Sequence, residues 1–258
     1  LKLADDLYWL SIADSNIWFW AGAIAAERGL DVEVSEPDVS PMALQGPKAE
    51  DVVAGVCGDW VRAIKYFWFR ETAIDGIPVV VQRSGWSKQG GFEIYLREGS
   101  EGNRLWAIFK EAGRPYGIGP GGPNWCERVE SGLISYGGDT DGSTNPFEVR
   151  MGNYLDLEVP DDTIGISALR RIAAEGPRRH TLGMILDAGD PVSPGFLWNP
   201  IFRDGRKVGD LTNCIFSYRL RKNIGFALID RGCAIGERLQ ASIGGVMQTG
   251  TLTDLPFI

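Results

Sequence analysis

The sequence has little histidine, few cysteines and no long apolar segment. Its 258 residues include one histidine, His180, and four cysteines without a CxxC pair. A zinc ribbon or a thioredoxin-like motif is therefore excluded. Any Ser-His-Asp, Cys-His or multi-histidine mechanism would depend on His180 alone. We predict that His180 is a partly exposed strand residue and that the cysteines are buried thiols.

Positive charge is also scarce. Lys and Arg number 26 against 34 Asp and Glu, which gives a net charge of -8. A polyanionic partner is disfavoured because phosphate neutralisation needs a cationic surface. No apolar run reaches the roughly 20 residues that cross a bilayer, and the start lacks the features of a secretion signal. We expect a cytoplasmic protein that binds a small molecule, and neither nucleic acid, membrane nor metal; the sequence favours no oligomeric state.

The composition that remains is globular, with 44% hydrophobic residues and turn signals throughout, including 34 Gly and 14 Pro. Segment patterns predict an α+β protein with antiparallel sheets and a C-terminal all-β barrel. We expect a strand-like start over 1–14 with Asp5 and Asp6 in its turn. Further predicted elements are helices over 17–29, 46–58, 104–112, 125–134 and 161–176, two short strands in 30–45, a hairpin over 77–97, and strands over 180–187, 207–217, 224–230, 238–244 and 246–258.

The hairpin carries the most informative pattern. Side chains alternate along FEIYL, so Glu93 and Tyr95 share one face if Phe92 and its alternate neighbours face the core. Trp86 lies across the turn and can reach the same face. A carboxylate beside aromatic rings suits a ligand site, but the same alternation is typical of an ordinary exposed strand face with an aromatic pair.

Three other patterns have a structural and a functional interpretation. GIGPGG matches G-x-G-x-x-G only as letters, because a helix precedes it and Pro120 removes a donor; we interpret it as an interdomain loop. CERVES is either a solvated helix start, capped by Asn124, or the place of an arginine, Arg128, that recognises an anionic or heteroaromatic ligand. Most tryptophans are predicted to pack in cores, namely Trp9, Trp18, Trp20, Trp60, Trp68 and Trp106; the rarer alternative is an aromatic cluster that also binds a cation.

A series of motifs resembles the folate-dependent aminomethyltransferase family, that of the glycine-cleavage T protein. SPMALQGPKAEDV, SGWSKQGGFEIYL, ERVESGLISYGGD, NPFE, TIGISALRRI, KVGDLTN, KNIGFALI and LPFI follow in the family's order and cover essentially the whole chain. Within the family, SGWSKQGGFEIY and the LKLADDLYWLSIAD start are most similar to the dimethylsulfoniopropionate (DMSP) demethylases. These move a methyl group from a sulfonium to tetrahydrofolate.

The resemblance implies tetrahydrofolate as cofactor and places roles on six residues. Glu93 matches the glutamate that holds the pterin edge, and Arg128 an arginine beside the folate site. Ser11, Trp60, Trp86 and Tyr95 match the DMSP pocket. Aromatic rings attract a sulfonium cation, and the sulfonium is already a good leaving group, so catalysis would rest on holding the reactants in line in a dry pocket.

The resemblance also implies a domain arrangement and one departure from the family. Residues 1–30 and 118–176 would belong to the folate-binding first domain, 31–117 to an α+β second domain, and 177–258 to the barrel. The family's catalytic aspartate falls before Leu1, so we expect an N-terminally truncated chain with no catalytic residue of its own. Alternatives are an aminomethyltransferase, another folate-dependent demethylase, or a non-catalytic folate-binding accessory protein; the KGCYxGQ-type motif of the accessory members is missing from the sequence.

Overall fold

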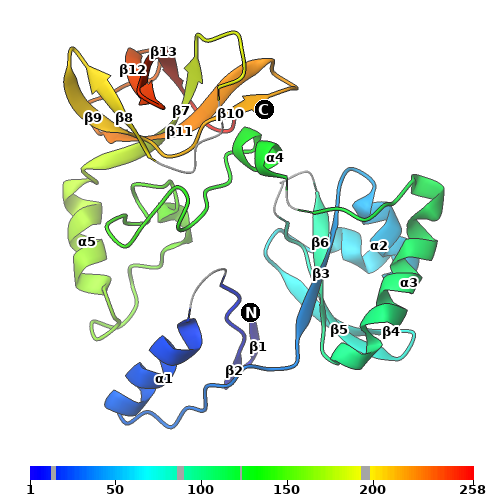
Figure 1. Cartoon of the computed structure of the whole chain (residues 1–258). Helices are drawn as coiled ribbons and strands as arrows, with labels where there is room; N and C mark the ends of the chain where they lie inside the picture. Colours follow the sequence, from blue (N-terminus) through cyan, green and yellow to red (C-terminus); the bar gives the residue numbers. More distant parts are fainter. Residues whose placement is uncertain (13–15, 86–89, 123, 193–197) are drawn as a thin grey trace. The chain divides into compact units, whose positions relative to one another are not determined.

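The computed structural model describes the chain except for residues 13–15, 86–89, 123 and 193–197. Its contacts divide the chain into two compact units, Leu1–Pro123 and Asn124–Ile258, which are drawn in Figure 1. Each unit is described by itself. The predicted grouping of residues 1–30 with 118–176 in one domain stays a prediction.

The first unit combines a small N-terminal hairpin, a helix and an α+β sandwich. Its elements are β1 (Lys2–Ala4), β2 (Leu7–Tyr8), α1 (Ile17–Glu27), β3 (Ser40–Gln45), α2 (Ala49–Cys57), η1 (Asp59–Ala63), β4 (Phe69–Ile74), β5 (Ile77–Gln82), β6 (Gly91–Leu96), η2 (Gly99–Glu101), α3 (Gly102–Gly113) and η3 (Arg114–Tyr116).

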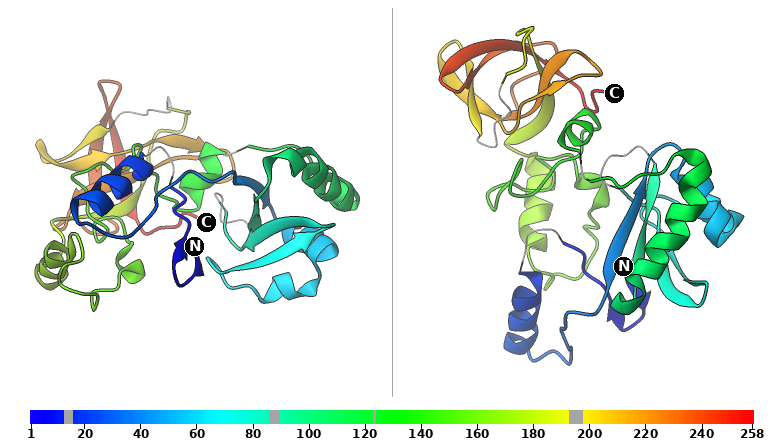
Figure 2. Two further views of the ribbon diagram at one scale, coloured as in Figure 1. Left: turned by 90° about the horizontal axis from the view of Figure 1, so that it is seen from below. Right: turned by 45° about the vertical axis from the view of Figure 1, so that its right-hand side comes forward.

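The sandwich is an antiparallel sheet with one face covered by helices. The strand order is β3-β6-β5-β4, and the predicted hairpin forms from β5 and β6. Figure 2 shows α2 and α3 beside this sheet. Val52 and Val53 of α2 and Leu105 and Phe109 of α3 join one buried cluster with alternate residues of β6. The helices bury one sheet face because their apolar side chains recur at helical spacing.

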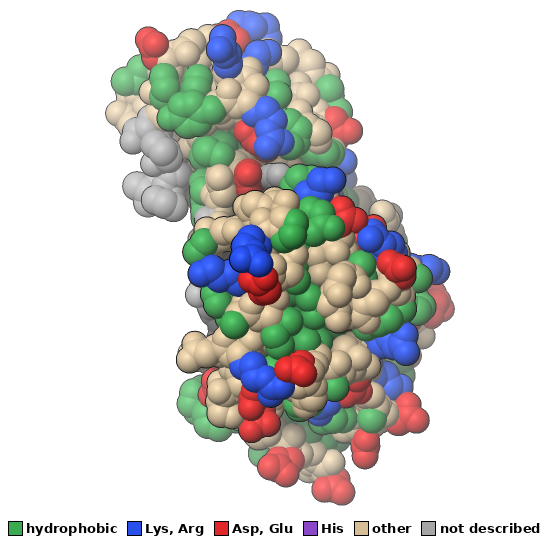
Figure 3. Space-filling view, turned by 90° about the vertical axis from the view of Figure 1, so that its right-hand side faces the viewer, with side chains coloured by type: hydrophobic (Ala, Val, Ile, Leu, Met, Phe, Trp, Pro, Cys, Tyr) green, Lys and Arg blue, Asp and Glu red, His purple; other side chains and the backbone are tan. Residues whose placement is uncertain are grey.

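The helical side of this unit carries ion pairs at its surface. Arg62 lies within 3.2 Å of Glu50, Asp51 and Asp59, and Arg104 pairs with Asp75 and Glu101. In Figure 3, basic and acidic side chains are interspersed over this face. Exposed pairs of this kind contribute little to stability, since water screens them.

The second unit opens with two helices and closes in a barrel. Its elements are α4 (Trp125–Glu130), η4 (Gly152–Tyr154), α5 (Ile166–Glu175), β7 (Arg179–Leu186), β8 (Asn199–Arg203), β9 (Arg206–Leu211), β10 (Ile215–Ser217), β11 (Lys222–Asp230), β12 (Arg238–Ile243) and β13 (Val246–Thr253). The Asn124 side chain accepts from the N–H groups of Cys126 and Glu127, so the predicted cap of α4 is observed.

Antiparallel pairing closes the barrel. The strand order is β10-β11-β7-β13-β12-β8-β9, and β9 also pairs with β11. The six strands from β11 to β9 therefore form a closed ring, and β10 pairs with β11 outside it. Closure removes unpaired sheet edges. The interior is apolar and includes Met184, Ile201, Leu211 and Ala241, all 0% exposed. The predicted fold class, α+β with antiparallel sheets and a terminal barrel, is confirmed.

Two sequence predictions about elements were incomplete. Residues 30–45 form one strand, β3, and no second strand lies in the preceding residues. Strands β4 and β8 were not predicted; each is short and β8 contains Pro200.

The prediction that most tryptophans lie in cores was wrong for four of the six. Trp18, Trp20, Trp68 and Trp106 are 47 to 63% exposed, whereas Trp9 and Trp60 are partly buried. Helix α1 is apolar around its whole circumference, and of its residues Ala25 is the one that is buried. Trp106 follows the buried Leu105 of α3, one step around the helix.

Candidate functional site

The candidate site begins with the side-chain alternation of β6. Phe92, Ile94 and Leu96 point into the helix-covered core. Glu93 and Tyr95 therefore share the opposite face, where Glu93 lies across from Gln82 and Tyr95 across from Val80 on β5. Tyr95 is 6% exposed and Glu93 is partly buried. The strand thus presents a carboxylate and a phenol side by side.

The Glu93 carboxylate is held by a neighbour that the sequence did not indicate. The hydroxyl of Ser84, which is 5% exposed, donates a hydrogen bond to Glu93 Oε2. Gln45 at the end of β3 donates from Nε2 to the carbonyls of Ser84, at 3.2 Å, and Phe92, at 3.3 Å. The carboxylate therefore has one oxygen fixed by the hairpin itself.

Tyr95 connects this carboxylate to the N-terminal segment. Burial raises the pKa of the Tyr95 phenol, the negative charge of Glu93 raises it further, and a hydrogen bond with the Ser11 hydroxyl acts in the opposite direction. The rings of Trp9 and Tyr95 have centroids 6.2 Å apart, and the Arg97 guanidinium lies 5.3 Å from the Trp9 ring centroid. The structure thus brings together Ser11, Glu93 and Tyr95.

The other two residues predicted for the substrate pocket are Trp86 and Trp60. Trp86 falls outside the described residues. Trp60 packs against the core on the helix-covered face, donates from Nε1 to the Cys57 carbonyl at 2.6 Å, and stacks under Arg70 at 4.6 Å. Because Glu93 and Tyr95 occupy the opposite face, the structure does not bring Trp60 to them.

Arg128, the second residue predicted to bind cofactor, lies in the other unit and is fully buried. Its Nη1 donates to Asp139 Oδ2 at 2.5 Å and to the Leu133 carbonyl at 2.6 Å, and its guanidinium lies 4.1 Å from the Trp125 ring centroid. The interpretation of this stretch as a solvated helix start was wrong, since Glu130 is also buried. A ligand would reach Arg128 only by displacing these contacts, and its cofactor role stays a prediction.

The sequence reasoning missed Ser84, Gln45 and Trp9 as members of this group. The hairpin register held a signal for Ser84, because Gln82 pairs with Glu93 and a residue two positions beyond continues on the same side. Gln45 and Trp9 reach the site through tertiary contacts, which no short sequence pattern marks.

The histidine and the cysteines lie outside the β6 group. His180 lies on β7, and burial lowers the pKa of its imidazole. Burial raises the pKa of the Cys57 thiol to about 11 and that of Cys214 to about 12, so these thiols stay protonated near neutral pH. Within the described ranges, no cluster of three His, Cys, Asp or Glu side chains fits a metal ion, and no helix has the length and apolarity to span a bilayer.

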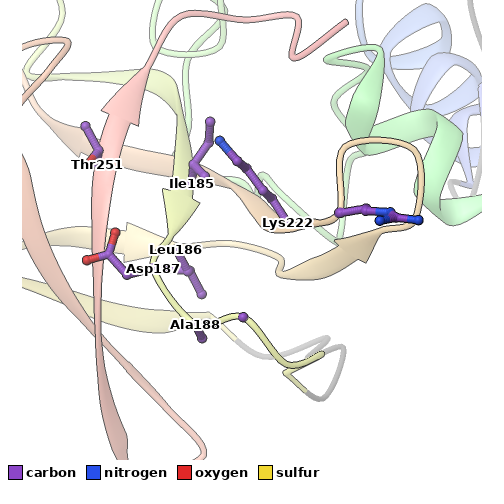
Figure 4. A pocket seen from close by; sticks show the side chains of 8 residues that line it. Ile185, Leu186, Asp187, Ala188, Lys222 and Thr251 are labelled. Atoms are coloured by element: carbon purple, nitrogen blue, oxygen red, sulfur yellow. The ribbon is translucent and has the colours of Figure 1, made fainter.

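A separate pocket of about 400 Å³ lies on the second unit, where β7 ends and β11 begins. Figure 4 shows Lys222 beside Ile185, while Asp187 points toward Thr251. Asp187 already pairs with Arg238. The described lining brings together no carboxylate and aromatic group like that of β6, so the first unit holds the stronger candidate site.

The β6 group suits recognition of a flat, nitrogen-rich ring next to a cation. A carboxylate accepts two parallel N–H bonds, and aromatic faces attract cations. Glu93 is only partly buried, so a ligand can reach the carboxylate. Among the described members of the group, none has the paired acid and base arrangement of a hydrolase. The arrangement supports binding and orientation of reactants.

Two family models match this chain. Residues 1–158 match the family described as GCVT N-terminal domain, and residues 179–258 match the Glycine cleavage T-protein C-terminal barrel domain. The second match covers the strands that close the ring in the structure.

Individual relatives carry two kinds of activity. Dimethylsulfoniopropionate demethylase DmdA of Ruegeria pomeroyi is 44% identical over 90% of this chain and 62% of its own length. An aminomethyltransferase of Clostridium botulinum is 34% identical over 89% of this chain and 62% of its own length. The chain thus spans about three fifths of these relatives. In structure, the glycine cleavage system aminomethyltransferase T of Bartonella henselae matches with a TM-score of 0.71 at 20% identity, covering 93% of this chain and 66% of that one.

Proposed function

Since the chain belongs to the glycine-cleavage T-protein family, we propose that it takes part in a tetrahydrofolate-dependent methyl transfer in which DMSP is the methyl donor. The bond between sulfur and the methyl carbon would break as the bond from N5 to that carbon forms, and the products would be methylmercaptopropionate, 5-methyltetrahydrofolate and the N5 proton, released to water. The observation that carries the proposal is the group on β6, where Glu93, Tyr95 and Ser11 converge on one face of the sheet.

The residues present fit a pterin and a small cation. Glu93 has one oxygen occupied by Ser84, and the carboxylate retains acceptor capacity for the N–H groups of a pterin edge. The Tyr95 ring offers a π-face, on the order of 1–2 kcal/mol for a desolvated cation, whereas the Arg97 guanidinium already lies over the neighbouring Trp9 ring. When bound, tetrahydrofolate supplies the nitrogen nucleophile that accepts the methyl group.

The contribution of the chain to such a reaction is orientation. The group that leaves a sulfonium is a neutral thioether, which needs no proton, so the site needs no general acid. Aromatic faces favour the cationic ground state, and positive charge leaves sulfur as the methyl moves, so the rings bind more than they accelerate. The rate gain would come from a fixed geometry and from exclusion of water. A carboxylate held by the hairpin serves that purpose.

The second candidate function is aminomethyl transfer, which the names of the Clostridium relatives favour. The higher identity to the demethylase supports methyl transfer from DMSP instead. The hairpin sequence GWSKQGGFE supports it too, because the glycine-cleavage proteins it resembles read more like GYTGEDGFE there. Another folate-dependent demethylase and a non-catalytic folate-binding protein are the remaining alternatives.

The experiment is a product assay with tetrahydrofolate and DMSP on the longest purified form of the protein that contains this chain. Methylmercaptopropionate release supports the proposal, and Tyr95→Ala and Trp86→Ala should raise KM for DMSP strongly. Arg114→Ala is a suitable control, since Arg114 is an exposed residue that pairs only locally with Glu111. Aminomethyl turnover with glycine-cleavage partners and none with DMSP would reject the assignment.

A further inference from the structure

Ser84 stands at the point where the β5–β6 hairpin leaves its ladder. The last pair of the ladder joins Gln82 to Glu93, and Ser84 follows two residues later. Its side chain is 5% exposed, and its hydroxyl donates to Glu93 Oε2. A buried hydroxyl that donates to a carboxylate makes one of the stronger types of hydrogen bond, because the acceptor is charged.

The position of Ser84 is itself fixed from β3. Gln45 donates from one side-chain nitrogen to the carbonyls of Ser84 and Phe92, so it joins both arms of the hairpin. Two glycines leave room for this side chain. A Cβ at Gly85 would lie 1.9 Å from Gln45 Oε1, and one at Gly91, where φ is +154°, would lie 2.7 Å from Gln45 Cδ.

These contacts form a connected support for the carboxylate. Gln45 holds the Ser84 backbone, Ser84 holds one oxygen of Glu93, and Tyr95 lies against the same carboxylate. A glutamate side chain has three rotatable bonds, and freezing them during ligand binding costs affinity. A carboxylate held before the ligand arrives avoids that cost.

We infer that Ser84 is a positioning residue, which fixes the Glu93 carboxylate so that its remaining acceptor sites meet the N–H donors of a pterin edge. The inference rests on the proposed function, because it assigns to Glu93 a ligand that donates hydrogen bonds. It adds that recognition of the pterin depends on a hydroxyl that need not touch the ligand. Gln45 acts one step further away, through the backbone of Ser84.

The test measures the Kd for tetrahydrofolate by titration calorimetry on the full 258-residue chain. Ser84→Ala should raise Kd roughly tenfold, and Ser84→Thr, which keeps a hydroxyl, should restore it to within about threefold of the wild type. Ser100→Ala is the matched control, because Ser100 also donates to a glutamate, Glu98, at 3.0 Å but on the exposed surface. It should leave Kd unchanged.

A second ligand separates positioning from general damage to the fold. A tetrahydrofolate analogue without the pterin 2-amino group lacks one donor for Glu93. In the wild type it should bind more weakly than tetrahydrofolate, and Ser84→Ala should reduce the ratio of the two Kd values. An equal loss for both ligands would overturn the inference. If Ser84→Ala does not fold, Ser84→Cys keeps the volume with a weak donor and takes its place.

Glu93→Ala separates failure of the proposed function from failure of the positioning role of Ser84. If it leaves tetrahydrofolate binding unchanged, or if the wild type does not bind, the proposed function fails and the inference with it. If Glu93→Ala weakens binding while Ser84→Ala binds like the wild type, only the inference is overturned. If both variants weaken binding and the double variant is no worse than Glu93→Ala alone, the coupling of Ser84 to Glu93 is supported.

Discussion

The ion pair between Arg128 and Asp139 gives the strongest prediction about stability. Their side chains are 0% and 2% exposed, and the charged atoms lie 2.5 Å apart. Asp139 also accepts from the Ser135 N–H at 2.9 Å, from the Thr212 hydroxyl at 3.0 Å and from the Asn213 side-chain amide. One carboxylate therefore joins the end of α4 to the loop after β9.

Asp139→Ala should lower the free energy of unfolding of the second unit by about 3–5 kcal/mol. This is the typical cost of removing one partner of a buried ion pair, because the Arg128 charge stays buried after its carboxylate partner is lost, although it keeps the Leu133 carbonyl. The three neutral donors would lose an acceptor as well, which places the value toward the upper end. Replacing both partners by leucine should cost less than Asp139→Ala alone, since no isolated charge is left.

The assay is urea unfolding followed by tryptophan fluorescence, to which Trp125 contributes directly because its ring contacts the Arg128 guanidinium. Asp141→Ala is the control: this exposed carboxylate accepts only from Ser143 and Thr144 nearby, and its loss should cost under about 1 kcal/mol. An Asp139→Ala loss no larger than that of the control would refute the reasoning.

Three further predictions concern ionisable groups. Glu93→Gln should move the pKa of Tyr95 down toward its ordinary 10.0. The pKa is measured by absorbance at alkaline pH, and Tyr95→Phe identifies the part of the signal that comes from Tyr95. An unchanged pKa would contradict contact between the two groups. Burial lowers the pKa of His180 below 6.5, so the unfolded chain takes up a proton more readily than the folded chain. The free energy of unfolding should therefore fall as the pH drops below about 6.5, and it should fall less in His180→Gln. An equal pH dependence of the two proteins would refute this prediction. Cys57 is partly buried. With its pKa near 11, about one Cys57 thiol in a thousand is ionised at pH 8, so Ellman's reagent should label it far more slowly than free cysteine, and fast labelling of the folded chain would contradict the raised pKa.

The periodic elements were predictable because local rules and burial agree. Strand β6 alternates between the core and the opposite face of the sheet, and α4 follows an asparagine whose side chain caps it. The alternation of β6 also places Glu93 and Tyr95 on one face without any knowledge of the rest of the fold. These features follow from periods of two and 3.6 residues.

Features that depend on tertiary contacts were not predictable. No local sequence pattern separates Trp60 from Trp106, yet Trp60 packs against the core and Trp106 is 48% exposed. The charged run around Arg128 is typical of a solvated helix, but Asp139 and Trp125 make its burial possible. Gln45 contacts the carbonyls of Ser84 and Phe92 from another strand, β3. In each case the partner is distant in sequence or set by pairing.

Tetrahydrofolate titration of the wild-type chain beside Glu93→Gln tests the central claim most directly. The account predicts saturable binding by the wild type and a Kd roughly ten- to a hundredfold higher for Glu93→Gln, because a charge-assisted hydrogen bond contributes about 1.5–3 kcal/mol. Equal affinity in the two proteins, or no binding by either, would contradict it.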